Sequence, residues 1–138
     1  MYWYTIGQTL TPQERAPTPE QPAVVLLTSE ELSHQPELPG LERTLHHTPP
    51  ARDARVCKAE VRSDCLAGTL VLPRQGKDGK PLACGYLVTG TRVVLVDDES
   101  ALQGLLRHIA REKRWTDGSV GRFLYDFFEQ LIARDLHR

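Results

Sequence analysis

The chain has 138 residues, 40% of them hydrophobic and 25% charged, and a formal net charge of −1. This composition is typical of one soluble globular domain, so we expect residues 1–138 to form a single domain. A near-neutral chain provides no positive field that would attract phosphate backbones, which excludes nucleic acid as a partner.

The N-terminal part of the sequence alternates between extended and broken segments. Residues 1–8 alternate aromatic and β-branched side chains and predict a strand, whereas the prolines of residues 9–22 predict a loop without regular structure. Residues 23–48 begin with a continuous apolar run, AVVLL, which is typical of a central strand covered on both faces. The spacing of Thr28 and Glu31 then predicts a capping box, at the start of the first of the short helices expected in this segment.

Residues 56–97 predict a meander of four antiparallel strands. From Val56 onward, hydrophobic and charged residues alternate with a period of two, as in a strand with one solvated face. The glycine-punctuated stretch 74–80 predicts a hairpin tip, and Thr89 with Gly90 predicts a second turn before the last strand.

Two helices are expected in residues 99–138. In the first, four aliphatic residues recur at helical spacing between preceding acids and following bases, an order that complements the helix dipole. The second carries an apolar stripe with hardly a gap: Val120, Phe123, Leu124, Phe127, Phe128, Leu131, Ile132 and Leu136. The order of elements predicts an α/β (α+β) fold, a mixed, mostly antiparallel sheet sandwiched between helices.

The common catalytic motifs are absent from the sequence, including GxSxG, Walker-type loops and HExxH. His46 and His47 are neighbours, and neighbouring helical residues point about 100° apart, so surface histidines are favoured over a shared metal ion. Asp97, Asp98 and Glu99 carry the oxygen ligands that Mg²⁺ and Ca²⁺ prefer, but the same acids suit a helix N-terminus. We therefore expect no enzymatic activity.

Two further residue groups favour structural roles. Asp126 and Glu129 lie three residues apart, which a solvated helix face explains. The cysteines are odd in number and lack CxxC spacing, so neither a disulfide framework nor a zinc site is indicated. We expect small, half-buried strand residues in a reducing cytosol at Cys57, Cys65 and Cys84.

The C-terminal part contains the string YLVTGTRVVLVDDESALQGLLRHIAREKRWTDGSVGRFLYDFFEQLIARDL. Its order of strand pair, helix, basic loop and helix resembles the cytoplasmic N-terminal region of the CorA family of divalent-cation transporters. Upstream, residues 58–61 followed by the apolar run 66–72 resemble a strand hairpin of that family. Leu41, Glu42 and Leu45 match a helix that family members begin with Leu-Glu-Asp.

The resemblance implies a cytoplasmic regulatory and assembly domain of a homopentameric transporter of Mg²⁺ or another divalent cation. Its partners would be its own subunits, and it would lie at the cytoplasmic face of the inner or plasma membrane. The pore, with the family signature Gly-Met-Asn, would lie in a C-terminal membrane part that is absent from these 138 residues. The final helix has no stop signal and would continue toward it, leaving the present chain as a soluble fragment.

The resemblance also implies a regulatory metal site. In the family, carboxylates between neighbouring cytoplasmic domains bind Mg²⁺, and the Asp of Leu-Glu-Asp is one such ligand. Arg43 occupies that position here, and a fixed cation cannot ligate Mg²⁺. Glu42 is therefore the candidate metal ligand; no catalytic or cofactor-binding residue is implied, and no cofactor is required for the fold.

Two other interpretations fit the same residues. The first is a free-standing cytosolic α/β interaction module that uses the C-terminal helix as its docking surface. The second is a small hydrolase that uses Asp97, Asp98 or the histidines. A reading frame that ends at Arg138 would favour the first of these over a transporter domain.

Overall fold

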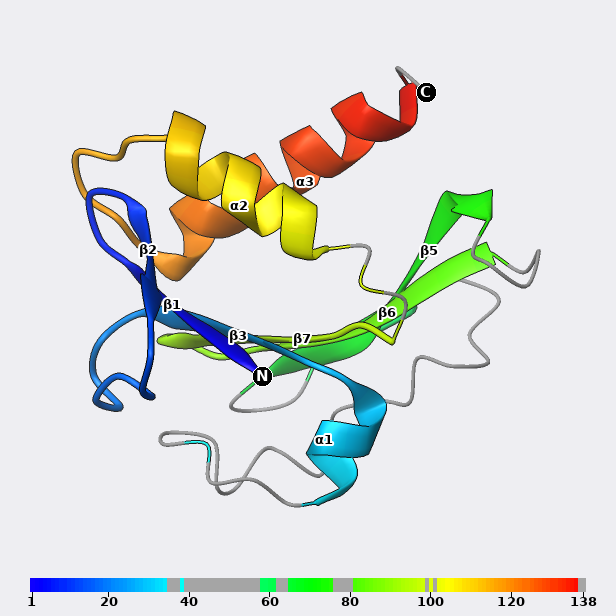
Figure 1. Cartoon of the computed structure of the whole chain (residues 1–138), viewed down its shortest axis with the longest axis horizontal. Coiled ribbons are helices and arrows are strands. Elements are labelled where there is room, and N and C mark those ends of the chain that lie inside the picture. Colours follow the sequence, from blue (N-terminus) through cyan, green and yellow to red (C-terminus); the bar gives the residue numbers. More distant parts are fainter. Residues whose placement is uncertain are drawn as a thin grey trace.

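The computed structural model describes residues 1–34, 38, 58–61, 65–75, 81–98, 100 and 102–136. Within these residues, seven strands form one sheet in the order β2-β1-β3-β7-β6-β5-β4. The strands are β1 Tyr2–Ile6, β2 Leu10–Gln13, β3 Ala23–Leu27, β4 Lys58–Val61, β5 Leu66–Gln75, β6 Pro81–Val88 and β7 Arg92–Val96. The helices are α1 Ser29–Ser33, α2 Gln103–Glu112 and α3 Val120–Leu136. Helices α2 and α3 lie on one face of the sheet and α1 on the other (Figure 1).

Every pair of neighbouring strands in the sheet is antiparallel except β3 and β7, which are parallel. The pairing of β4 with β5, β5 with β6 and β6 with β7 is the four-strand meander that the period-two pattern predicts. The predicted fold class, a mixed and mostly antiparallel sheet sandwiched between helices, is therefore confirmed.

The parallel pair β3–β7 lies at the centre of the sheet, and each of its residues is buried. Because side chains alternate between the two faces of a strand, burial of every residue requires cover on both faces. The run AVVLL is thus the central strand expected from the sequence.

Among the described residues, the core consists of two clusters separated by the sheet. The cluster on the face of α2 and α3, here called the helix face, joins β-strand residues to both helices and includes Val24, Leu95 and Leu106. The cluster on the opposite face includes Trp3 and Val25. Cys65 and Cys84 are more deeply buried than the half-buried positions expected; Cys84 lies in β6 as predicted, whereas Cys65 directly precedes β5, and Cys57 lies outside the described residues.

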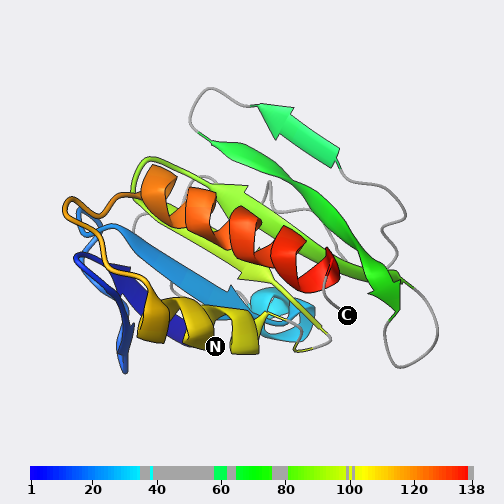
Figure 2. The same cartoon turned by 90° about the horizontal axis from the view of Figure 1, so that it is seen from above.

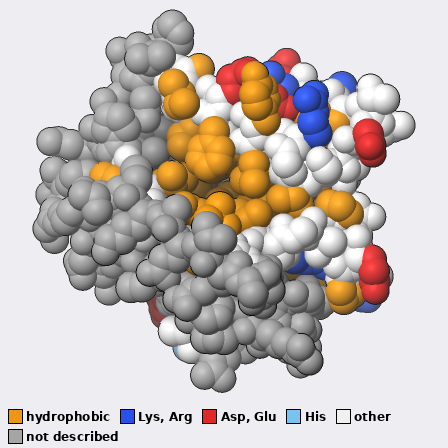
Figure 3. All heavy atoms as spheres, turned by 180° about the vertical axis from the view of Figure 1, so that it is seen from behind, with side chains coloured by type: hydrophobic (Ala, Val, Ile, Leu, Met, Phe, Trp, Pro, Cys, Tyr) orange, Lys and Arg blue, Asp and Glu red, His pale blue; other side chains and the backbone are white. Residues whose placement is uncertain are grey.

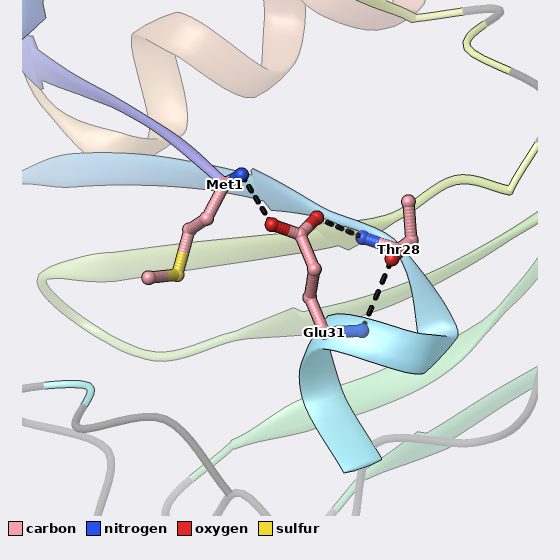
Figure 4. A network of polar contacts seen from close by, with 3 residues as sticks. All are labelled: Met1, Thr28 and Glu31. Carbon is pink, nitrogen blue, oxygen red and sulfur yellow. Dashed lines mark hydrogen bonds and ion pairs between the residues drawn. The ribbon is translucent and has the colours of Figure 1, made fainter. Parts of the chain in front are cut away.

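Helix α1 begins with the capping box predicted from the sequence (Figure 4). The Glu31 amide donates to Thr28 Oγ1 at 3.1 Å, and the Thr28 amide donates to Glu31 Oε1 at 3.0 Å. The other carboxylate oxygen of Glu31 pairs with the α-ammonium group of Met1 at 2.5 Å. Hydrogen bonding from this ammonium group is the main cause that lowers the pKa of Glu31.

The structure corrects the prediction for residues 9–22, where β2 occupies Leu10–Gln13 despite Pro12. Strand β2 lies at an edge of the sheet and pairs with β1 alone. An edge strand tolerates proline because one side of its backbone does not pair, so the missing N–H removes no ladder bond there. The predicted loop is therefore wrong for residues 10–13, which form β2.

The two helices predicted in residues 99–138 are present, with α2 starting at Gln103. The short helices predicted for residues 23–48 are represented by α1. The remainder of that segment, apart from the buried Leu38, lies outside the described residues.

Replacing Phe123 by alanine is predicted to lower the free energy of unfolding by about 3–5 kcal/mol, because the ring is fully buried in the helix-face core. The matched control is Ile132→Ala on the same helix, where the side chain is 60% exposed and a change within about 0.5 kcal/mol is expected. Urea unfolding followed by circular dichroism measures both. Equal effects of the two substitutions would contradict this account of the core.

Glu31→Gln is predicted to remove a pH-dependent contribution to stability of at most about 1 kcal/mol, since the carboxylate is 41% exposed and screened by solvent. The folded-state pKa of Glu31 is lowered, so this contribution is present above the carboxyl group's ordinary pKa and is lost as the pH falls through the folded value. The measurement is the difference in unfolding free energy between the two proteins from neutral to acid pH. A difference that grows on acidification would contradict the assignment.

Candidate functional site

Helix α3 carries a buried and an exposed row of apolar side chains. The buried row consists of Val120, Phe123, Phe127 and Leu131. The exposed row consists of Tyr125, Phe128 and Ile132, with 64%, 36% and 60% of their surface exposed. Core packing therefore uses part of the apolar stripe, and the exposed row remains open to solvent among the described residues.

An apolar groove with a cavity volume of about 70 Å³ lies beside the exposed row, between α3 and the sheet. Its lining residues are Leu66, Leu70, Tyr86, Val88, Val93, Leu95, Leu124, Phe127 and Phe128. Figure 3 shows a hollowed patch of hydrophobic side chains on one face of the molecule. Because Phe128 belongs both to the groove and to the exposed row, the two form one continuous apolar surface, here called the α3 surface.

The groove exists because two helices do not cover the full width of the sheet. Helix α2 contacts β2 and α3 contacts β5. Seen from above, β4 and part of β5 extend beyond α3 (Figure 2). The helix-face side chains at this side of the sheet, Leu66, Leu70, Tyr86 and Val88, are consequently half-buried.

The chemistry of the groove favours contact rather than catalysis. Its described lining is aliphatic and aromatic, and the Tyr86 phenol is its one side-chain hydroxyl. Apolar surface of this kind binds another apolar surface, because association removes both from water. The α3 surface is therefore the candidate site for docking of a further helix or subunit.

A buried polar contact fixes the start of α3. Trp115 Nε1 donates to Asp126 Oδ2 at 2.6 Å, and the Lys113 ammonium group lies 3.9 Å from both Asp126 and Glu129. The Trp115 amide also donates to the Gln8 carbonyl at 2.7 Å. The segment between α2 and α3 is thereby joined both to α3 and to the turn between β1 and β2.

This segment also approaches the β1–β2 turn closely through two glycines. A Cβ atom at Gly118 would lie 1.8 Å from the Gly7 carbonyl oxygen, a distance that no side chain tolerates. Glycine at this position is thus required by the packing of the segment that leads into α3.

The solvated helix face predicted for Asp126 is wrong. Asp126 is only 9% exposed and accepts the indole hydrogen bond, whereas Glu129 is exposed as predicted. The prediction failed because Trp115 lies in a loop, and helical spacing does not show which residue of α3 a loop side chain will reach. The sequence did contain one signal of this burial: Asp126 is an acid on the inward side of a helix whose stripe is otherwise apolar.

The carboxylates of Asp97 and Asp98 accept hydrogen bonds at the starts of two different helices. Asp97 Oδ2 accepts from the Leu102 amide at 2.8 Å, at the start of α2. Asp98 accepts from the Ser29 amide and from its hydroxyl, both at 2.7 Å, in the first turn of α1. The first turn of α2 contains no acid, and its N-cap residue Leu102 makes no side-chain cap hydrogen bond. Of the three acids predicted for this helix N-terminus, Asp97 therefore contacts the residue before the helix, Asp98 binds α1, and Glu99 lies outside the described residues.

The residues proposed for metal binding lie outside the described part of the chain. Glu42, Arg43, His46 and His47 all lie outside the described residues, so their predicted roles stay predictions. Within the described residues, no group of three or more His, Cys, Asp or Glu side chains is placed to hold a metal ion. Among these residues there is also no helix with the length and apolar character needed to span a membrane.

Comparison with known proteins relates this chain to solved structures through its fold. No family model and no curated protein sequence matches this chain. The solved structure of the full-length CmaX protein is similar, with a TM-score of 0.63 and 13% sequence identity. The similarity covers 97% of this chain and 45% of the CmaX chain, so the present chain spans less than half the length of that relative. At this identity the match defines a shared fold.

Asp126→Ala is predicted to lower the free energy of unfolding by about 1–3 kcal/mol, because it leaves the buried Trp115 indole N–H without this acceptor. Glu129→Ala, one turn further along the exposed side, should change it by less than about 0.5 kcal/mol. Chemical unfolding monitored by tryptophan fluorescence measures both values. Equal stability of the Asp126 variant and the wild type would show that the contact does not hold the α2–α3 segment.

Proposed function

We propose that this chain is the cytoplasmic regulatory and assembly domain of a CorA-like transporter of Mg²⁺ or another divalent cation. Two observations support the proposal: the resemblance of residues 86–136 to the cytoplasmic region of the CorA family, and the fold similarity to the full-length CmaX protein. The fold similarity extends over nearly the whole of this chain but less than half of CmaX. In the proposal, the pore lies in membrane helices outside these 138 residues, and the domain has no enzymatic activity of its own.

The α3 surface supports the assembly part of the proposal. A domain that packs against neighbouring subunits or further helices needs an apolar face that its own core does not consume. The exposed row of Tyr125, Phe128 and Ile132, continuous with the groove, has this property. In the homopentamer that the CorA resemblance implies, this surface is the candidate contact.

The regulatory part of the proposal rests on carboxylates that repel each other across a subunit boundary until a divalent cation binds between them. Glu42 is the proposed ligand on this chain. Arg43, at the position of the family's acidic ligand, places a fixed positive charge beside it, so we expect a weaker Mg²⁺ response than in a site with two acids.

The same exposed row also favours a second candidate function, a free-standing interaction module that docks a partner through α3. The two candidates differ in what lies beyond Arg138. A transporter domain requires a reading frame that continues into a long charged helix and two apolar spans with Gly-Met-Asn, whereas a module requires none of these.

The decisive experiment is to read the gene past the codon for Arg138 and to reconstitute the complete protein in liposomes. We expect the reading frame to continue into the two spans, and Mg²⁺ influx, reported by an enclosed fluorescent indicator, to depend on the protein. A stop codon directly after Arg138 would refute the transporter proposal and leave the module.

The regulatory ligand is tested in the same liposomes. Glu42→Gln should weaken inhibition of influx by millimolar Mg²⁺ on the domain side, while Glu20→Gln, an exposed acid elsewhere on the domain, should leave it unchanged. Equal inhibition of the wild type and both variants would contradict the proposal that Glu42 is a regulatory Mg²⁺ ligand.

A further inference from the structure

Arg92, the first residue of β7, is a charged residue with 0% of its surface exposed. Burial of an isolated charge costs several kcal/mol, so a buried guanidinium group persists only where hydrogen bonds replace its water. The partners of this group are therefore informative about what the residue does.

Backbone carbonyl groups of the segment 14–22, here called the strap, surround the Arg92 guanidinium group. Nη2 donates to the Pro17 carbonyl at 3.0 Å and to the Thr18 carbonyl at 2.6 Å. Nη1 donates to the Gln21 carbonyl and to the Thr91 carbonyl, the latter at 3.1 Å. Three of these four oxygens belong to the strap, although Arg92 is more than 70 residues further along the chain.

The open face of the guanidinium group meets an aromatic ring. Its central carbon lies 5.7 Å from the centroid of the Trp3 ring, within the range of a cation–π interaction. Trp3 belongs to the core cluster opposite the helix face, and Ala16 of the strap packs against the same cluster. The carbonyl oxygens and the ring together form a cation site that a planar guanidinium group fills.

The strap needs such a donor because of its own composition. Its prolines carry no N–H, which prevents the strap from pairing as a strand, yet its inward carbonyl groups still require hydrogen bonds. Among the described residues, the strap's other hydrogen bonds with the sheet lie near its end, where the Ile6 amide donates to the Pro22 carbonyl and Gln21 Nε2 donates to the Ile6 carbonyl. An arginine offers five N–H donors in one rigid plane and so serves several carbonyl groups at once.

We propose that Arg92 is the latch of the strap: the strap carbonyls and Trp3 form a guanidinium site, and the strap lies closed on the sheet only while a guanidinium group occupies it. The strap then opens and closes as one unit, independently of α2 and α3, which pack on the other face of the sheet. The proposal does not depend on the proposed transport function.

Hydrogen exchange measured by mass spectrometry on Arg92→Ala tests the latch. Strap protection is read from the Gln21 amide, which donates to the Thr18 carbonyl, and the Ile6 amide, which donates to the Pro22 carbonyl. We expect it to fall about tenfold or more, because several charge-assisted hydrogen bonds are lost together, while amides of α3 keep their protection. Addition of millimolar methylguanidinium should restore protection of the strap. Methylammonium, a cation that lacks the planar fork, should not.

The matched control is Arg122→Ala, which removes an exposed arginine and should leave the strap unchanged. Unchanged strap protection in Arg92→Ala, or a loss that methylguanidinium does not reverse, would overturn the proposal. If Arg92→Ala does not fold, Arg92→Lys decides: an ammonium group cannot span the four carbonyls, so strap protection equal to the wild type would also overturn it.

Discussion

The parallel pairing of β3 with β7 is the constraint on which the rest of the structure depends. Both strands are buried along their whole length, so each face of the sheet must carry a layer that excludes water. The cover on the helix face comes from α2 and α3. On the opposite face, Trp3 and the strap contribute to the second core cluster. Because β7 is the last strand of the meander and β3 precedes the meander, this one pairing also brings the two halves of the chain together.

The same constraint explains why α3 has apolar residues in excess of its core contacts. Two helices cover the centre of the sheet, but the meander extends the sheet beyond them through β5 and β4. The helix face at β5 is therefore half-buried, and the flank of α3 that borders it remains apolar. The core does not use the side chains of Tyr125 and Ile132, which are 64% and 60% exposed, so the α3 surface is where the proposed docking of a further helix or subunit would take place.

Local signals predicted the parts of the fold that depend on nearby residues. The run AVVLL, the capping box at Thr28 and the period-two meander all follow from spacing within a few residues, and each is present. What the sequence did not reveal depends on contacts between distant segments. The hydrogen bond of Asp98 to Ser29 spans 69 positions, and those of Arg92 to the strap span more than 70. Periodicity contains no information about such pairs, because a loop brings the partners together.

The buried charges bear on where a divalent cation could bind. Among the described residues, three charged side chains are buried: Arg92, Asp97 and Asp126. Each forms hydrogen bonds with backbone groups or with an indole N–H. Removing any of these contacts would leave a buried polar group unsatisfied, so none of the three is available to a metal at low cost. A cation sensor in the proposed function would therefore draw its carboxylates from exposed acids brought together by a second copy, or from residues outside the described part of the chain, which include Glu42. The first arrangement would make metal binding depend on assembly and so would link the proposed regulatory and assembly roles.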